Sequence, residues 1–362
     1  MINRRFNTGV KMENKLKNFK FKNVNRVFYL DQLRALAIIG VIGIHVTPDF
    51  FNSIVGIIFY FLSKIAIPIF FMITGALLLN KEYRIWDFLK KRYPRIIIPF
   101  IFWGAVYIIF AILFKNFMAI HLSLKNSMLI IINTFLGVEG YVPHFWYVWS
   151  ILGLYLLFPI INKWIKNASF SEIRYFLFIW FITSIFILFN LSYHLELKYF
   201  SGILGLVILG YYLANNNNKI LGNTFLWPIL FLISTLTRII CHNFSIDVDY
   251  SSNLGTLSII QAISIFLMIK NLNFNRIFTK VCSFLRNGII GKLTVSLSRY
   301  SYGIYLNHML FIISYRIMNL DFANKSAIIW VPLLIIAVLV FSWVPLIVMN
   351  KIPVLKKVTG MH

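Results

Sequence analysis

Acidic residues are scarce in this chain, and charged residues of either sign are few. Only 11 of its 362 residues are Asp or Glu, charged residues make up 13%, and hydrophobic residues make up 59%. A soluble protein has about 25% charged residues, so this chain lacks the polar surface that two or three water-soluble domains would need. The composition predicts instead an all-α, polytopic integral membrane protein, a helical bundle of about ten transmembrane helices.

Cysteines and the common nucleotide and metal motifs are also lacking. The two cysteines, Cys241 and Cys282, fall on opposite sides of the topology given below, so we expect no disulfide. The sequence has no Walker motif, no HExxH, no GxSxG elbow and no Cys/His cluster with metal-ligand spacing. These absences lead us to expect no metal, and they argue against ATP-driven transport and zinc-dependent hydrolysis.

The positive charge is abundant but scattered. The 35 Lys and Arg residues give a formal net charge of +24. A nucleic-acid-binding protein gathers such charge on a soluble face, whereas here the cations fall between apolar runs. We therefore expect no nucleic-acid partner, and we expect membrane lipids as partners instead.

Ten apolar runs are candidates for membrane spans. They lie at 29–47, 54–79, 96–114, 145–162, 175–191, 199–214, 224–241, 254–270, 300–318 and 327–349. With the N-terminus in the cytoplasm, 27 Lys and Arg fall in cytoplasmic segments and 4 fall in outer ones. This bias is typical of a multi-pass protein of the cell membrane with both termini cytoplasmic.

The topology divides the chain into three parts. We expect a basic cytoplasmic N-terminal tail at 1–27, a ten-span membrane domain at 28–349 and a short cytoplasmic C-terminal tail at 350–362. The first apolar run contains charged residues, and no A-x-A-like site follows it, so we expect no cleaved signal peptide.

Three ionisable residues interrupt the first span, where each of them costs free energy unless it has a role. Asp31 and Arg34 are three residues apart and therefore neighbours on one helix face. Arg34 and His45 are eleven residues apart, just over three turns, so they share a face at heights that differ by roughly 16 Å. The spacing suggests a ligand that lies along this helix. In the simpler alternative, Arg34 pairs with Asp31 and extends to the headgroups, while His45 bonds a neighbouring helix.

A second basic cluster follows the second span. Pro94 favours a helix start, which would bring Arg92 and Arg95 to a helix N-terminus whose free N–H groups suit phosphate oxygens. The alternative for this loop is a topogenic segment that binds anionic lipid. We assign the remaining four cations of the loop to that role: Lys81, Arg84, Lys90 and Lys91.

Other polar residues within the apolar runs need partners as well. Lys64 lies in the middle of the second span, where Pro68 should interrupt the helix and free a backbone carbonyl. His308 lies in the ninth span and either lines the same cavity or makes an interhelical hydrogen bond. We expect Arg238 and Arg316 to extend to the outer surface. An aromatic belt accounts for Trp146, Tyr147 and Trp149.

Five segments of the sequence, taken together and in order, resemble the acyltransferase-3 family of integral membrane acyltransferases. They are YLDQLRALAIIGVIGIH with its R-x10-H pattern, IPIFFMITGALL, the R-x-x-R motif Arg92-Tyr-Pro-Arg95, HFWYVWSILGLYLLFPI and SYGIYLNHMLFI. In the second segment Thr74 stands where the family commonly has Ser. The resemblance covers nearly the whole chain and agrees with the ten-span topology.

The resemblance implies transfer of an acyl group, usually acetyl, from cytoplasmic acyl-CoA to a hydroxyl of a cell-envelope glycan or its lipid-linked precursor. It implies that Arg34 and His45 form one functional pair and that Arg92 and Arg95 form another. It leaves open the roles of Glu139, His144 and His308. Adding the physical argument, we expect His45, Arg34 and Asp31 to serve catalysis. We expect acetyl-CoA, as acyl donor, to bind Arg92, Arg95, Arg34 and Lys64.

Three questions remain open from the sequence. His45 acts either as a general base or as a transient acyl carrier. The alternative function is export of a glycan or lipid without acyl-transfer chemistry. The chain is either a monomer or a homodimer.

Overall fold

The computed structural model describes residues 27–114, 135, 142–188, 200–244, 254–274, 284, 286–318, 320, 322 and 325–361. Within them the α-helices are α2 (Phe28–Val46), α3 (Ile54–Ser63), α4 (Ala66–Leu78), α5 (Ile85–Leu113), α7 (Trp146–Asn167), α8 (Phe170–Leu188), α9 (Ile203–Asn215), α10 (Leu226–Asn243), α11 (Thr256–Phe274), α13 (Ile289–Ile317) and α14 (Ala327–Met349). Short 3-10 turns are η1 (Thr47–Phe50), η2 (Pro143–Phe145) and η4 (Leu355–Val358). The described residues contain no β-strand.

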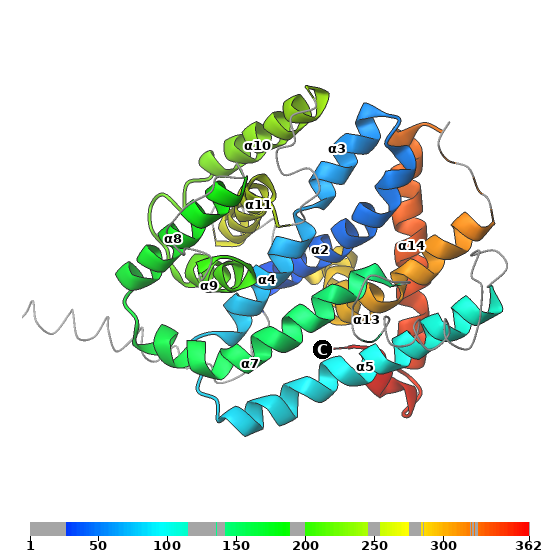
Figure 1. The fold of residues 1–362 in the computed structure, drawn as a ribbon, viewed down its shortest axis with the longest axis horizontal. Helices are drawn as coiled ribbons and strands as arrows, with labels where there is room; N and C mark the ends of the chain where they lie inside the picture. The colour runs from blue at the N-terminus through cyan, green and yellow to red at the C-terminus, as the bar shows by residue number, and fades with distance from the viewer. Residues whose placement is uncertain are drawn as a thin grey trace, which may run out of the picture.

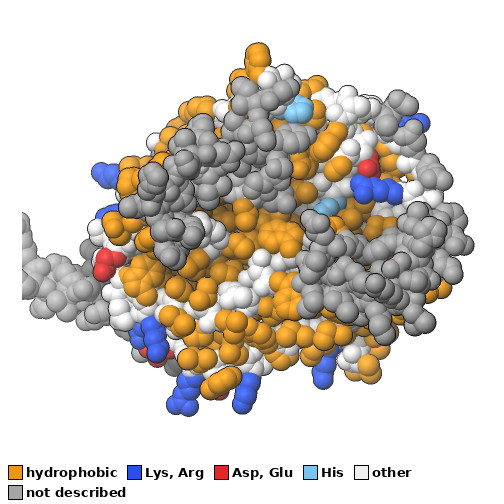
Figure 2. Space-filling view, viewed as in Figure 1, with side chains coloured by type: hydrophobic (Ala, Val, Ile, Leu, Met, Phe, Trp, Pro, Cys, Tyr) orange, Lys and Arg blue, Asp and Glu red, His pale blue; other side chains and the backbone are white. Residues whose placement is uncertain are grey.

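The chain is an all-α, polytopic membrane protein, as the composition predicts. Seven stretches of the described residues are long and apolar enough to cross a membrane, and each of the ten predicted spans overlaps a helix. Hydrophobic side chains dominate the face drawn in Figure 2, where several Lys and Arg side chains lie along the lower and left margins. The predicted N-terminal tail lies almost entirely outside the described residues.

Helix α2 lies at the centre of the bundle. It packs against α13 and α4, while α8 to α11 lie on one side of it and α5 and α7 on the other (Figure 1). A buried hydrogen bond joins α13 to α2, in which the Ser298 hydroxyl donates to the Asp31 carboxylate at 2.6 Å. Since α2 is nearly surrounded by protein, the polar residues along it are shielded from lipid.

The second span is interrupted where Pro68 predicts it. Helix α3 ends at Ser63 and α4 begins at Ala66, so Pro68 occupies the third position of α4. A proline in the first turn of a helix removes an N–H that has no intrahelical partner anyway. The interruption allows α3 and α4 to follow different directions, and α4 then packs closely on α9.

The C-terminal residues fold back onto the bundle. After η4, the carbonyl of Val358 accepts a hydrogen bond from the Trp103 indole at 3.2 Å, and Thr359 is fully buried. A Cβ added to Gly303 of α13 would lie 2.1 Å from the Thr359 carbonyl oxygen, so the tail passes directly over that glycine. The end of the chain therefore helps to hold α5 beside α13.

Candidate active site

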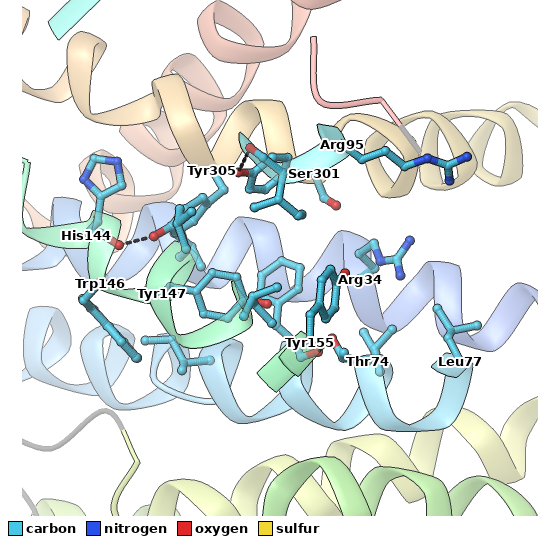
Figure 3. Close-up of a pocket in the computed structure, with 18 of the residues that line it drawn as sticks. Arg34, Thr74, Leu77, Arg95, His144, Trp146, Tyr147, Tyr155, Ser301 and Tyr305 are labelled. Carbon is cyan, nitrogen blue, oxygen red and sulfur yellow. Dashed lines mark hydrogen bonds between the residues drawn. The ribbon is translucent and has the colours of Figure 1, made fainter. Parts of the chain in front are cut away.

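A cavity of about 660 Å³ lies among residues of α2, α4, α5, α7 and α13. Its volume falls within the range of about 300–1,000 Å³ that is typical of small-molecule pockets. The close-up in Figure 3 shows side chains from these helices converging on one elongated space. Arg34 and Arg95 lie toward one side of this space and His144 toward the other (Figure 3). The four lining cations are here called the basic end, and the lining histidines with their aromatic neighbours the histidine end.

The basic end consists of Arg34, Lys81, Arg92 and Arg95. Arg92 and Arg95 are three residues apart in α5 and therefore share a helix face. The expectation that they lie at a helix N-terminus is wrong, because α5 begins at Ile85 and Pro94 lies inside it. Anion binding at this end must therefore depend on guanidinium and ammonium groups rather than on free backbone N–H groups.

Lys81 belongs to this cation cluster and not only to a topogenic loop, which corrects the assignment made from the sequence. Asn162 of α7 fixes the loop, since its amide oxygen accepts the Lys81 backbone N–H at 3.2 Å and its amide nitrogen donates to the Leu78 carbonyl at 3.3 Å. Partial burial, and secondarily the positive charge of Arg92, lowers the pKa of the Lys81 ammonium below its ordinary value of 10.5. A bound anion would relieve this repulsion.

Two tyrosines fix the arginine-bearing part of α5 against its neighbours. The Tyr93 hydroxyl donates to the Leu152 carbonyl of α7 at 2.9 Å. The Tyr302 hydroxyl donates to the Ile96 carbonyl of α5 at 2.8 Å and thereby ties α13 to the same turn. These bonds hold the guanidinium-bearing face of α5 toward the cavity.

The histidine end contains three imidazoles from three different elements. The ring centroids of His45 and His144 are 6.1 Å apart, those of His45 and His308 are 5.3 Å apart, and those of His144 and His308 are 5.0 Å apart. His45 and His144 line the cavity, whereas His308 is fully buried behind it. The Tyr305 hydroxyl donates to the backbone carbonyl of His144, which fixes η2 against α13 (Figure 3).

The cavity joins the two ends along one face of α2. Arg34 and His45 both line it, so the shared face that their spacing predicts is present. Along a regular helix the eleven-residue separation corresponds to roughly 16 Å. A ligand that bridges both ends must therefore be anionic at one end and reactive or polar at the other.

The sequence matches a family model described as an acyltransferase domain over residues 27–347, nearly the whole chain. The chain belongs to the acyltransferase-3 family. No curated protein and no solved structure is significantly similar to it.

In this membrane acyltransferase, four of the six residues expected from the sequence line one cavity: Arg34, His45, Arg92 and Arg95. Two others do not. Asp31 is buried beside Ser298, and Lys64 is fully buried with its ammonium 4.7 Å from the centroid of the Tyr60 ring. The roles of Asp31 in catalysis and of Lys64 in donor binding remain predictions, and these positions favour support of the helices over ligand contact. Glu139 lies outside the described residues.

Several lining residues of the acyltransferase cavity were not expected from the sequence. Trp146 and Tyr147 line it instead of serving only an aromatic belt, while Trp149 keeps 41% of its surface exposed. The polar groups that join them are Thr74, Tyr155, Ser301, Tyr302 and Tyr305. The only sequence signal for these residues was their position within family segments, since helix periodicity does not show which face turns toward a cavity.

Of the two outer arginines, Arg238 differs from expectation because it is buried, whereas Arg316 keeps 41% of its side chain exposed, as expected, and also bonds to α2 and η1. Arg238 is 2% exposed and donates to Ser258 at 2.8 Å and to Gln261 at 3.1 Å, which ties α10 to α11. Arg316 donates to the Asp49 carboxylate at 2.8 Å and to the His45 carbonyl at 2.9 Å. The second arginine therefore fixes the turn of α2 that carries His45.

Proposed function

We propose that this acyltransferase takes an acetyl group from cytoplasmic acetyl-CoA and passes it to a hydroxyl of a cell-envelope polysaccharide or of a lipid-linked sugar precursor. The observation that carries the proposal is the single cavity that joins four cations to His45. The positive-inside charge distribution supports a location in the cell membrane with the basic end and both termini on the cytoplasmic side.

The basic end suits the phosphate groups of coenzyme A. Guanidinium groups bind phosphate oxygens with paired, charge-assisted hydrogen bonds, and a lysine adds a compact positive charge. Arg92 and Arg95 on one face of α5, together with Arg34 and Lys81 in the lining of the same cavity, would bind such a polyanion. The flexible arm of the donor would then follow α2 toward the histidine end, which brings the thioester close to His45.

His45 suits the role of general base for the transfer. In this scheme its ring nitrogen takes the proton of the acceptor hydroxyl as the hydroxyl oxygen attacks the thioester carbonyl carbon. The carbon–sulfur bond then breaks, and the proton held by His45 passes to the departing CoA sulfur. The products are the acetyl ester and free CoA, and His45 returns to its neutral form.

An alternative route uses His45 as the nucleophile. The acetyl group would first move to the imidazole nitrogen with release of CoA and would then move to the acceptor hydroxyl. Rapid mixing of the enzyme with radiolabelled acetyl-CoA alone separates the two routes. Stoichiometric CoA release with label retained on the protein supports the carrier, and CoA release that requires acceptor supports the base.

The function is tested with purified protein in nanodiscs, given labelled acetyl-CoA and a lipid extract of the envelope that contains glycan precursors. We expect acetyl-CoA-dependent label in the glycan fraction, loss of this label in His45→Ala, and retention of it in the control His242→Ala, which changes a histidine of α10. In sealed proteoliposomes, glycan that crosses the membrane without acetylation, unchanged by removal of acetyl-CoA, would instead establish an exporter. Thermal stabilisation by free CoA measures donor binding separately.

A further inference from the structure

His308 of α13 is a fully buried histidine whose ring hydrogen bonds define its protonation pattern. Its Nδ1 lies 2.8 Å from the Tyr305 carbonyl oxygen and 3.2 Å from the Ile304 carbonyl oxygen. Carbonyl oxygens only accept hydrogen bonds, so Nδ1 must carry the hydrogen. The neutral ring then presents a lone pair on Nε2, which has no hydrogen-bond partner within the described protein.

The neighbours of this lone pair are a small set of rings. The titratable side chains in ring contact with His308 are His45, His144 and Tyr305. The Tyr305 hydroxyl is already bonded to the His144 carbonyl. A buried acceptor without a donor is costly, so an N–H from one of the two other imidazoles is the natural partner.

We take His45 as the partner because two hydrogen bonds fix α13 against α2, the helix that carries His45. Ser298 of α13 binds Asp31 of α2 at 2.6 Å, and Arg316 of α13 binds the His45 carbonyl at 2.9 Å. The His45 and His308 ring centroids are 5.3 Å apart with the rings tilted by 46°, a separation at which two imidazoles can share an N–H···N hydrogen bond. The His144 ring is as near to His308, at 5.0 Å between centroids, but its turn η2 is tied to α13 by the one hydrogen bond from Tyr305, whereas α2 is tied to α13 at both Asp31 and His45.

We propose that His308 is a positioning residue whose Nε2 accepts the N–H of His45 and so directs the other ring nitrogen of His45, with its lone pair, into the cavity. This inference rests on the proposed function, in which His45 is the base. When His45 takes the acceptor proton, its bond to His308 becomes charge-assisted and stronger. A neutral imidazole anchored by two carbonyls thus fills the orienting role that a carboxylate fills in many histidine-dependent enzymes. It does so without a second buried charge in the bilayer.

The pair is tested by three variants that separate the acceptor atom from the bulk of the ring. His308→Phe keeps a ring but removes the acceptor, His308→Gln offers an amide oxygen close to the position of Nε2, and His242→Phe is the matched control in α10. We expect His308→Phe to lower kcat about 10- to 100-fold with KM for acetyl-CoA unchanged, as loss of an orienting partner does elsewhere. We expect His308→Gln to recover most of the rate and His242→Phe to retain it.

Two outcomes of these assays would overturn the pairing. Unchanged kcat in a folded His308→Phe protein is one. The other is a His308→Gln protein that keeps the wild-type melting temperature but is as slow as His308→Phe. That result would show that the acceptor atom at this position does not matter and that the ring serves packing.

A spectroscopic measurement on the wild-type protein makes the test independent of activity. In 15N-histidine NMR of the protein in nanodiscs, with signals assigned by His45→Ala and His308→Gln, we expect a protonated Nδ1 and a hydrogen-bonded, unprotonated Nε2 for His308. A protonated Nε2 on His308 overturns the inference. A wild type that shows the paired imidazoles but transfers no acetyl group instead refutes the proposed function alone.

Discussion

The guanidinium of Arg316, near the end of α13, donates to the backbone carbonyl of His45, at the end of α2, at 2.9 Å. The same guanidinium pairs with Asp49 at 2.8 Å, and the Tyr315 hydroxyl donates to Asp49 at 2.6 Å. Residues from two helices and from η1 thus fix the last turn of α2. The position of the His45 ring in the cavity depends on this turn, so the Arg316 contact links a residue outside the cavity to the chemistry inside it.

We expect Arg316→Met to lower acetyl transfer about 10-fold, because the loosened turn lets His45 leave its reactive orientation. The loss of stability should be small, about 1 kcal/mol or less, since the Arg316 side chain is 41% exposed and the Asp49 side chain 23%. Arg316→Lys, which keeps the charge beside Asp49, is the matched control. Steady-state kinetics and melting temperatures check this, and wild-type kcat in Arg316→Met would refute the link.

Removal of single cations from the basic end should weaken donor binding. We expect Arg92→Gln and Arg95→Gln each to raise KM for acetyl-CoA about 10- to 100-fold, the effect of losing a charge-assisted hydrogen bond of about 1.5–3 kcal/mol. Lys90→Gln and Lys91→Gln are controls, because these residues share the first turns of α5 but do not line the cavity. Isothermal titration with free CoA measures the effect without turnover, and equal losses in all four variants would indicate only a diffuse surface charge.

The sequence was sufficient for the spans but not for the ends of some helices. Hydropathy follows from composition, so every predicted span overlaps a helix. Helix α5, however, begins at Ile85 and α13 at Ile289, each eleven residues before the predicted span. Those added turns carry Lys and Arg residues, so a hydropathy window does not extend the spans into them. Pro94 is tolerated inside α5, where it leaves only one carbonyl without its intrahelical partner.

The sequence predicted the part of the candidate site whose geometry depends only on residue spacing within one helix. Arg34 and His45 share a face because both belong to α2, and that relationship needs no tertiary information. The contribution of Lys81 depends instead on Asn162, which is 81 residues away and holds the loop. The approach of His308 to His45 likewise depends on how α13 registers against α2, which no local pattern contains.

The lowered pKa of Lys81 predicts a pH dependence of donor affinity. Burial, and then Arg92, place its folded pKa below the ordinary 10.5, so the ammonium loses its proton earlier than in the unfolded chain. Between the lowered pKa and 10.5 the unfolded chain binds more protons, and this residue makes stability rise with pH. Binding of CoA favours the charged form, so affinity should fall as pH rises through the same window. Calorimetry from pH 7 upward should show this fall in the wild type and a smaller one in Lys81→Arg, whose charge persists. Identical profiles in the two proteins would exclude Lys81 as the source.

Because α4 packs closely on α9, replacing either of two glycines at this contact should destabilise the fold. A Cβ on Gly75 would lie 1.7 Å from the Val207 carbonyl oxygen, and one on Gly210 would lie 1.9 Å from the Met72 carbonyl oxygen. Both obstacles are backbone atoms that cannot rotate away, so the helices must separate, as at other small-residue contacts between membrane helices. We expect Gly75→Ala and Gly210→Ala each to destabilise the fold by about 1–3 kcal/mol, the usual effect of overpacking. Gly153→Ala in α7 is the control, because nothing lies within 4 Å of its added Cβ. Melting temperatures in one detergent compare the three variants, and a Gly75→Ala protein as stable as Gly153→Ala would show that α4 and α9 have room to separate.

Since Thr74 of α4 lines the cavity beside Gly75, a separation of these helices should also lower acetyl transfer at temperatures where the protein remains folded.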